Sequence, residues 1–147
     1  MRGEGAMTRI RYRASPPQLR ESWLRERIEG GIRPLVRLLI EIGAHPVWSC
    51  EGHRFVRPSM VCWMPPRLRR MVRPNKPWVI LASSNRAFLD VQLGGLMRVC
   101  EGPASVRTFT MRANADNPRC PLRTALPGAR IFALVVFDGR KAAKVKR

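Results

Sequence analysis

Residues 129–137 read Ala-Arg-Ile-Phe-Ala-Leu-Val-Val-Phe, and this stretch decides the fold that the sequence predicts. It is the strongest strand signal in the chain, because β-branched and aromatic residues dominate it and no glycine or proline interrupts it. A strand this apolar is expected at the centre of a sheet. Asp138-Gly139 then turns the chain out of the strand.

Four further segments are expected to join this strand in a sheet. Trp78–Ala82 is apolar without alternation, which indicates a strand buried on both faces. The other predicted strands are Pro46–Cys50, Ser59–Met64 and Val106–Arg112. Residues 65–77 hold four prolines, so we expect a loop or a splayed hairpin tip there rather than a helix.

Two helices are expected to cover the sheet. Ser15 is a candidate N-cap for the first, which Gly30-Gly31 interrupts before an apolar half from about Ile32 to Ile42. A serine or asparagine at 83–85 can cap the second helix, which runs to about Val99. The predicted fold is therefore α+β, in the order α-β-β-β-α-β-β. Two helices pack on one face of a mainly antiparallel sheet of about five strands.

The composition predicts one globular domain. With 147 residues, 45% of them hydrophobic, the chain can bury roughly two thirds of its unfolded surface. We expect a flexible basic arm at residues 1–14, the globular domain at 15–139 and a basic tail at 140–147. The N-terminal residues lack the apolar core of a signal peptide, no C-x-x-C pair occurs, and no apolar run approaches the ~20 residues of a membrane span. A cytoplasmic protein with reduced thiols and no membrane span is expected.

The net charge of +18 points to a polyanionic partner, nucleic acid before membrane. Of the 28 basic residues 24 are Arg, which is suited to bidentate phosphate contacts. Seven basic side chains and no acidic one lie in residues 54–76, and five more follow Gly139. The residues expected to bind nucleic acid are Arg54, Arg57, Arg67, Arg69, Arg70, Arg73, Lys76, Arg140, Lys141 and Lys144.

Trp63 and Trp78 would be available to stack on unpaired bases. The alternative is that both basic runs are solvated and have no specific ligand. No ribonucleoprotein strand signature, Gly-x-x-Gly clamp or zinc-finger spacing occurs, so the sequence predicts neither a sequence preference nor the type of nucleic acid. The alternative partner is a nucleic-acid-binding complex.

The most reactive stretch, Gly-Ala-His-Pro-Val-Trp-Ser-Cys-Glu-Gly-His at residues 43–53, places a thiol, a carboxylate and an imidazole within four residues. Cys50, Glu51 and His53 are the candidate catalytic residues. His53 would lower the pKa of Cys50, and Glu51 would orient the imidazole. Glu51 would point to the opposite face of a strand, however, which makes that triad awkward.

The same turn suits a metal ion as well. Cys50 and His53 could chelate zinc, with Cys62 and then Cys100 or Cys120 completing the four ligands. A third interpretation is purely structural: Cys50 is a small buried hydrophobe and His53 is hydrogen-bonded to the backbone.

Trp48-Ser49-Cys50-Glu51-Gly52-His53, after an apolar helix and before a predicted strand, resembles small bacterial proteins of phages, plasmids and integrative elements. The likeness covers about residues 32–64 and implies a context without an assigned activity. A fainter similarity, through Ser49, Cys50 and Gly52, is to the wybutosine-synthesis proteins, which modify tRNA. Those proteins carry Arg where this chain has His53, and no adenosylmethionine loop is visible here.

Two hypotheses from different classes follow. The first is an accessory protein of a mobile element that binds nucleic acid without catalysis. The second is an enzyme that uses Cys50 and His53, directly or through zinc, on RNA or a small polar substrate. The charge favours the first.

Overall fold

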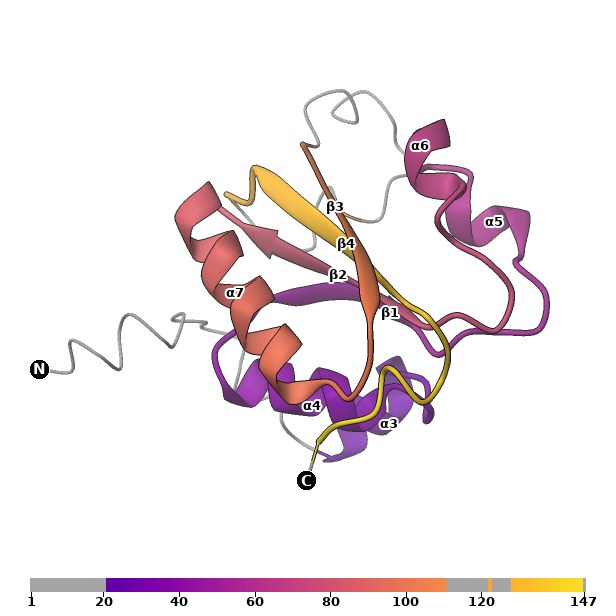
Figure 1. Cartoon of the computed structure of the whole chain (residues 1–147), viewed down its shortest axis with the longest axis horizontal. Helices are drawn as coiled ribbons and strands as arrows, with labels where there is room; N and C mark the ends of the chain where they lie inside the picture. Colours follow the sequence, from indigo (N-terminus) through magenta and orange to yellow (C-terminus); the bar gives the residue numbers. More distant parts are fainter. Residues whose placement is uncertain (1–20, 111–121, 123–127, 147) are drawn as a thin grey trace, which may run out of the picture.

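The structure is a computed structural model that describes residues 21–110, 122 and 128–146 (Figure 1). Its elements are α3 (Glu21–Arg27), α4 (Arg33–Glu41), β1 (Pro46–Cys50), α5 (Pro58–Val61), α6 (Pro66–Arg69), β2 (Trp78–Ser83), α7 (Arg86–Val99), β3 (Ala104–Thr110) and β4 (Ile131–Phe137). The expected arm at 1–14, the Ser15 cap and Cys120 lie outside the described residues. None of the helices in the described ranges is both long and apolar enough to cross a membrane.

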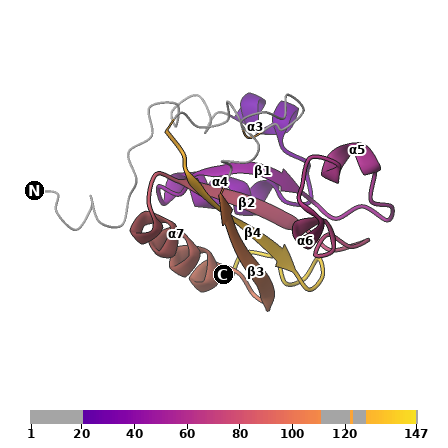
Figure 2. The same cartoon turned by 90° about the horizontal axis from the view of Figure 1, so that it is seen from above.

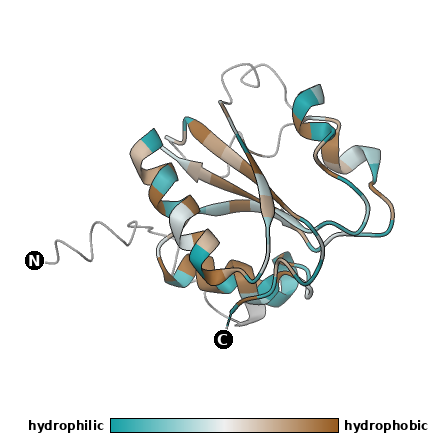
Figure 3. Cartoon of the chain, in the orientation of Figure 1, coloured by the Kyte–Doolittle hydropathy of each residue, from teal (hydrophilic) through white to brown (hydrophobic). Residues whose placement is uncertain are grey.

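The four strands form one antiparallel sheet in the order β1-β2-β4-β3. The central position expected for residues 129–137 is confirmed, because β4 lies between β2 and β3. Every residue of β2 is buried, and in β4 only Ile131 is partly exposed. These two strands are the most hydrophobic part of the sheet (Figure 3). Their continuous apolar runs fit a position where both faces are covered.

One face of the sheet is covered by α4 and α7, as expected. The apolar stripe of α4 and Leu89 and Leu96 of α7 form one core with the strand residues on that face. Asn85 is the N-cap of α7, because its side chain accepts a 2.9 Å hydrogen bond from the Phe88 amide. The strand residues in this core are Val79, Leu81, Ala133, Val135 and Phe137.

The other face is covered by the segment between β1 and β2, which lies on the opposite side of the sheet from α7 (Figures 1 and 2). Val61, Trp63, Met64 and Leu68 pack there against Ile80, Phe132 and Leu134, with Leu122 in the same core. The central strands β2 and β4 therefore have buried side chains on both faces, and the domain has three layers.

Two predictions for this segment were wrong. Ser59–Met64 is not a strand, since Pro58–Val61 forms the one-turn helix α5, and the sheet accordingly has four strands instead of five. Residues 65–77 are not free of helix either, because Pro66–Arg69 forms α6. In both helices a proline occupies the first turn, where its missing N–H costs no hydrogen bond.

The basic segment after β4 packs onto the domain. Ala142 and Ala143 are buried in the core beneath α7, and Val145 forms a bridge with Cys100. Backbone hydrogen bonds join Glu101 to Lys144 and Gly102 to Ala142. The boundary expected at residue 139 therefore does not coincide with a break in the packing.

Candidate functional site

The turn that follows β1 is built around Gly52. Its φ is +87°, a conformation that only glycine adopts without strain, and an added Cβ would lie 2.8 Å from the Pro77 nitrogen. The Asn75 amide donates to the His53 carbonyl at 2.8 Å. The turn thus lies directly against the backbone that leads into β2, and this contact fixes the directions of Cys50 and His53.

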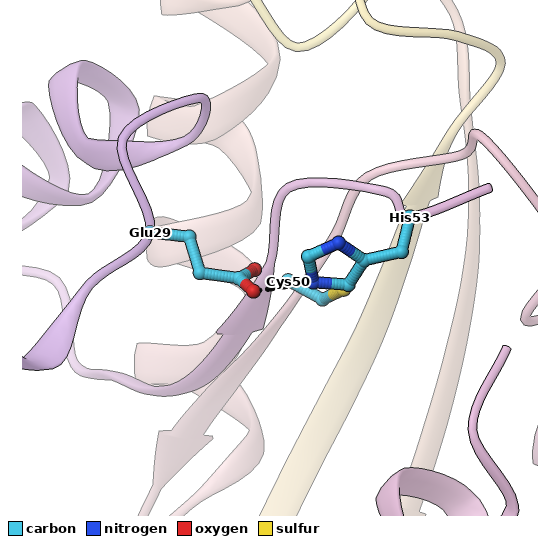
Figure 4. Close-up of side chains that lie close together, drawn as sticks. All are labelled: Glu29, Cys50 and His53. Carbon is cyan, nitrogen blue, oxygen red and sulfur yellow. Dashed lines mark hydrogen bonds and ion pairs between the residues drawn. The ribbon is translucent and has the colours of Figure 1, made fainter. Parts of the chain in front are cut away.

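The structure supplies a carboxylate to this turn from Glu29, in the link between α3 and α4. The carboxylate of Glu29, the thiol of Cys50 and the ring of His53 point toward one another (Figure 4). His53 Nε2 is hydrogen-bonded to Glu29 Oε2, and the amide of Glu51 donates to Glu29 Oε1 at 2.7 Å. One ligand-type atom from each of Glu29, Cys50 and His53 lies within 4.8 Å of the other two.

Glu51 does not have the role that the sequence suggested. Its Oε1 accepts a 2.6 Å hydrogen bond from the Gly31 amide, so Glu29 and not Glu51 is the carboxylate that contacts the imidazole. A Cβ on Gly31 would lie 2.6 Å from Glu51 Oε1, so any larger residue would push the Glu51 side chain away from this position. Cys50 and Glu51 were expected to point to opposite faces of a strand, which would keep Glu51 from acting with Cys50. In the structure the carboxylate beside His53 comes instead from Glu29, 24 positions earlier in the sequence.

The environment of Cys50 favours the neutral thiol. Only 3% of Cys50 is exposed, and burial raises the pKa of its thiol. A hydrogen bond from the Gly52 amide to Sγ (3.5 Å) opposes this shift in part, whereas the Glu29 carboxylate adds to it. The prediction that His53 lowers the pKa of Cys50 is wrong, because the net shift of this pKa is upward. Cys50 is therefore not a preformed thiolate nucleophile.

The remaining cysteines are not brought to this cluster. Cys62, expected as a third metal ligand, is exposed, and its Sγ contacts the Ser59 carbonyl at 3.8 Å. Cys100 is buried in the core on the α4–α7 face. His45 is buried, and its amide donates to the Gln92 side chain at 2.8 Å, which indicates a structural role.

Three of the basic residues lie at a second feature, a groove of about 390 Å³ between the segment after α6 and the adjoining ends of β3 and β4. Arg70, Arg73 and Lys76 line it, and its one carboxylate, Asp138, is bonded to Lys76 at 3.0 Å. Among the described residues, neither Arg70 nor Arg73 has an ion-pair partner. We call this feature the basic groove. The rest of its lining is Met71, Pro103, Ala104, Ser105, Val136 and Phe137.

The expected nucleic-acid contacts are all on the surface. Lys76 is half-buried and the other nine are exposed, and Arg140 donates to the Gly52 carbonyl at 2.9 Å. The prediction that Trp63 and Trp78 are available to stack on bases is wrong, since the two side chains are only 5% and 1% exposed. Among the described residues, Phe55 is the most exposed aromatic side chain at 73%, ahead of Trp48 and Phe88 at 40% and 39%, and the Arg54 guanidinium lies 5.6 Å from the centroid of its ring.

Sequence reasoning missed Glu29 and Phe55 for different reasons. Glu29 follows a run of charged residues in the sequence, and its distinguishing mark there is that it directly precedes Gly30-Gly31. Phe55 lies between two arginines in an acid-free run, which is a usable signal for an exposed stacking residue.

Comparison of the chain with protein-family models, with curated proteins and with solved structures found no match. The site must therefore be interpreted from its own geometry.

Proposed function

We propose that the protein binds nucleic acid without catalysis, through the basic groove and the exposed side chains beside it. The observation that carries the proposal is the meeting of two acid-free runs in one region. Lys76 contacts Asp138 at the end of β4, and Arg140 contacts Gly52 at the turn after β1. These two contacts bring Lys76 and Arg140, which are far apart in the sequence, into the same region of the domain, where both can attract a polyanion.

The chemistry of the groove suits phosphates. Two guanidiniums, Arg70 and Arg73, are exposed and free to make bidentate contacts, and Lys76 adds a point charge. The net charge of +18 adds a long-range attraction for any polyanion. Phe55 offers a ring on which an unpaired base can stack, which favours a single strand over a duplex.

The free thiols of Cys50, Cys62 and Cys100 suit the reducing cytoplasm. The resemblance of the Ser49–His53 turn to proteins of mobile elements suits an accessory role on nucleic acid, and it adds no activity.

Fluorescence anisotropy with a labelled single-stranded RNA, a single-stranded DNA and a DNA duplex, each over a series of salt concentrations, tests the proposal. In the variant Arg70→Gln/Arg73→Gln we expect the affinity for single strands to fall at least about tenfold. The slope of log K against log salt should become shallower by about 1.4, the value for two lost phosphate contacts.

Arg37→Gln/Arg98→Gln is the matched control, because it removes the same charge from α4 and α7, which cover the other face. Absence of binding at low salt would overturn the proposal. An equal loss in both variants would show that only the net charge matters and would overturn the role of the groove.

A further inference from the structure

We infer that Glu29, Cys50 and His53 form a binding site for one zinc ion, with a fourth position open to water. The site differs from the set expected from the sequence, because Glu29 takes the place of Cys62. It is independent of the proposed function, since none of its three residues is needed for phosphate contacts.

The positions of the three side chains fit a small tetrahedral ion. Zinc bonds of about 2.0–2.3 Å place neighbouring ligands roughly 3.5 Å apart. One atom from each of Glu29, Cys50 and His53 already lies within 4.8 Å of the others, so the three need only small rotations to converge. Entry of the ion would replace the hydrogen bond between His53 and Glu29 by two metal bonds, and the Cys50 thiol would release its proton to solvent as its sulfur binds the metal.

The donor set selects the metal. A thiolate with an imidazole and a carboxylate is characteristic of zinc and similar transition metals, whereas Mg²⁺ and Ca²⁺ require oxygen ligands. The Glu29 and His53 side chains are 36% and 37% exposed, so solvent reaches the ion position. Three protein ligands with one water is the pattern of zinc sites that keep an exchangeable position.

Groups around the ligands hold them in place. The Glu51 amide binds Glu29 Oε1 and leaves Oε2 for the ion, and the Gly52 amide donates to Cys50 Sγ. Such amide donors stabilise a sulfur that carries negative charge. The Arg140 side chain also donates to the Gly52 carbonyl. Two of these three contacts come from backbone amides, which no side-chain substitution removes.

The test is the zinc content of untagged protein after incubation with zinc and dialysis, measured by elemental mass spectrometry. We expect about one zinc per chain in the wild type. Affinity should fall at least about tenfold in each of Cys50→Ser, His53→Gln and Glu29→Gln. Cobalt in place of zinc should give a sulfur-to-cobalt charge-transfer band that Cys50→Ser abolishes.

The controls are Cys62→Ser, Cys100→Ser and Glu51→Gln, which should all retain the ion. Circular dichroism identifies any variant that fails to fold. If Cys50→Ser does not fold, Glu29→Gln decides whether the three residues bind zinc, because this substitution keeps a hydrogen-bonding group at the same place. A wild type without stoichiometric zinc overturns the inference, as does full retention of zinc in the folded Glu29→Gln protein.

Discussion

The guanidinium of Arg140 donates a 2.9 Å hydrogen bond to the carbonyl oxygen of Gly52, across 88 positions of sequence. The contact ties the segment after β4 to the turn that positions Cys50 and His53. Because a charged donor strengthens a hydrogen bond, Arg140 should stabilise the folded state in addition to adding a positive charge to the surface.

We expect Arg140→Ala to lower the free energy of unfolding by about 1 kcal/mol, the loss of a partly exposed charged hydrogen bond. Its neighbour Lys141 is exposed, and Lys141→Ala should change stability by less than about 0.5 kcal/mol. Urea denaturation followed by circular dichroism measures both. Equal values for the two variants would show that the contact contributes nothing.

Two glycines should respond to alanine in opposite ways. Gly52→Ala places a Cβ 2.8 Å from the backbone of Pro77 at a φ of +87°, so we expect a loss of at least about 2 kcal/mol. Gly94 lies in the middle of α7 with nothing within 4 Å of an added Cβ, and Gly94→Ala should raise stability by about 0.5–1 kcal/mol. Thermal unfolding of both variants beside the wild type tests the pair. A Gly52→Ala protein as stable as the wild type would contradict the turn geometry.

The side chain of Gln92 joins α7 to the sheet. It accepts from the His45 amide at 2.8 Å and donates to the Ala82 carbonyl at 2.7 Å, and it is 2% exposed. Gln92→Leu leaves both backbone groups buried without this partner and should cost roughly 2–3 kcal/mol. Val91→Ala, at the exposed position before it, should cost less than about 1 kcal/mol. Chemical denaturation compares them, and a neutral Gln92→Leu would show that other groups or water satisfy this pair.

The stability of the protein should fall in alkali because of Cys100. Burial raises the pKa of this thiol to about 11 from 9.0, with Lys146 opposing the shift. The folded state holds the proton more tightly than the unfolded state. The contribution of the protonated Cys100 thiol to the free energy of unfolding is therefore complete below pH 9 and is lost as the pH rises through 11. Cys100→Ala should lose less stability over that range than the wild type, as measured by urea unfolding at each pH, and parallel losses would disprove the role of the thiol.

The thiols should react in the order of their exposure. Cys62 is exposed, whereas Cys50 and Cys100 are buried with raised pKa values. At neutral pH iodoacetamide should modify Cys62 first among these three. Peptide mass spectrometry with time gives the order. Modification of Cys50 before Cys62 would show that Cys50 is a reactive nucleophile, which contradicts the neutral buried thiol in the structure.

The parts of the fold that the sequence predicted are those with one dominant local signal. β2 and β4 are continuous apolar runs, and the α7 cap is a short-range hydrogen bond from the Phe88 amide to the Asn85 side chain. Ser59–Met64 was misassigned because a short apolar segment has the same pattern in a strand and in a helical turn. The prolines that decide its conformation act through their position in the first turn, which the hydrophobic pattern does not show.

Of the candidate site, only the two residues that are close together in the sequence could be predicted. Cys50 and His53 belong to one turn, and their adjacency is visible in the sequence. Glu29 reaches them because the chain reverses at Gly30-Gly31 and α4 packs on the sheet, which no local pattern records. The same holds for the basic groove, where Lys76 and Asp138 meet only after β2 and β4 have paired.

The place of β4 in the sheet has a consequence for synthesis on the ribosome. β4 is the last of the four strands to be translated, yet it separates β2 from β3. Until it emerges, β3 has no neighbour, and the apolar side chains of β2 lack the partner that completes both cores. Until β4 is made, the nascent chain must therefore keep the apolar surfaces that β4 later covers soluble, and a strongly positive chain resists aggregation during that time.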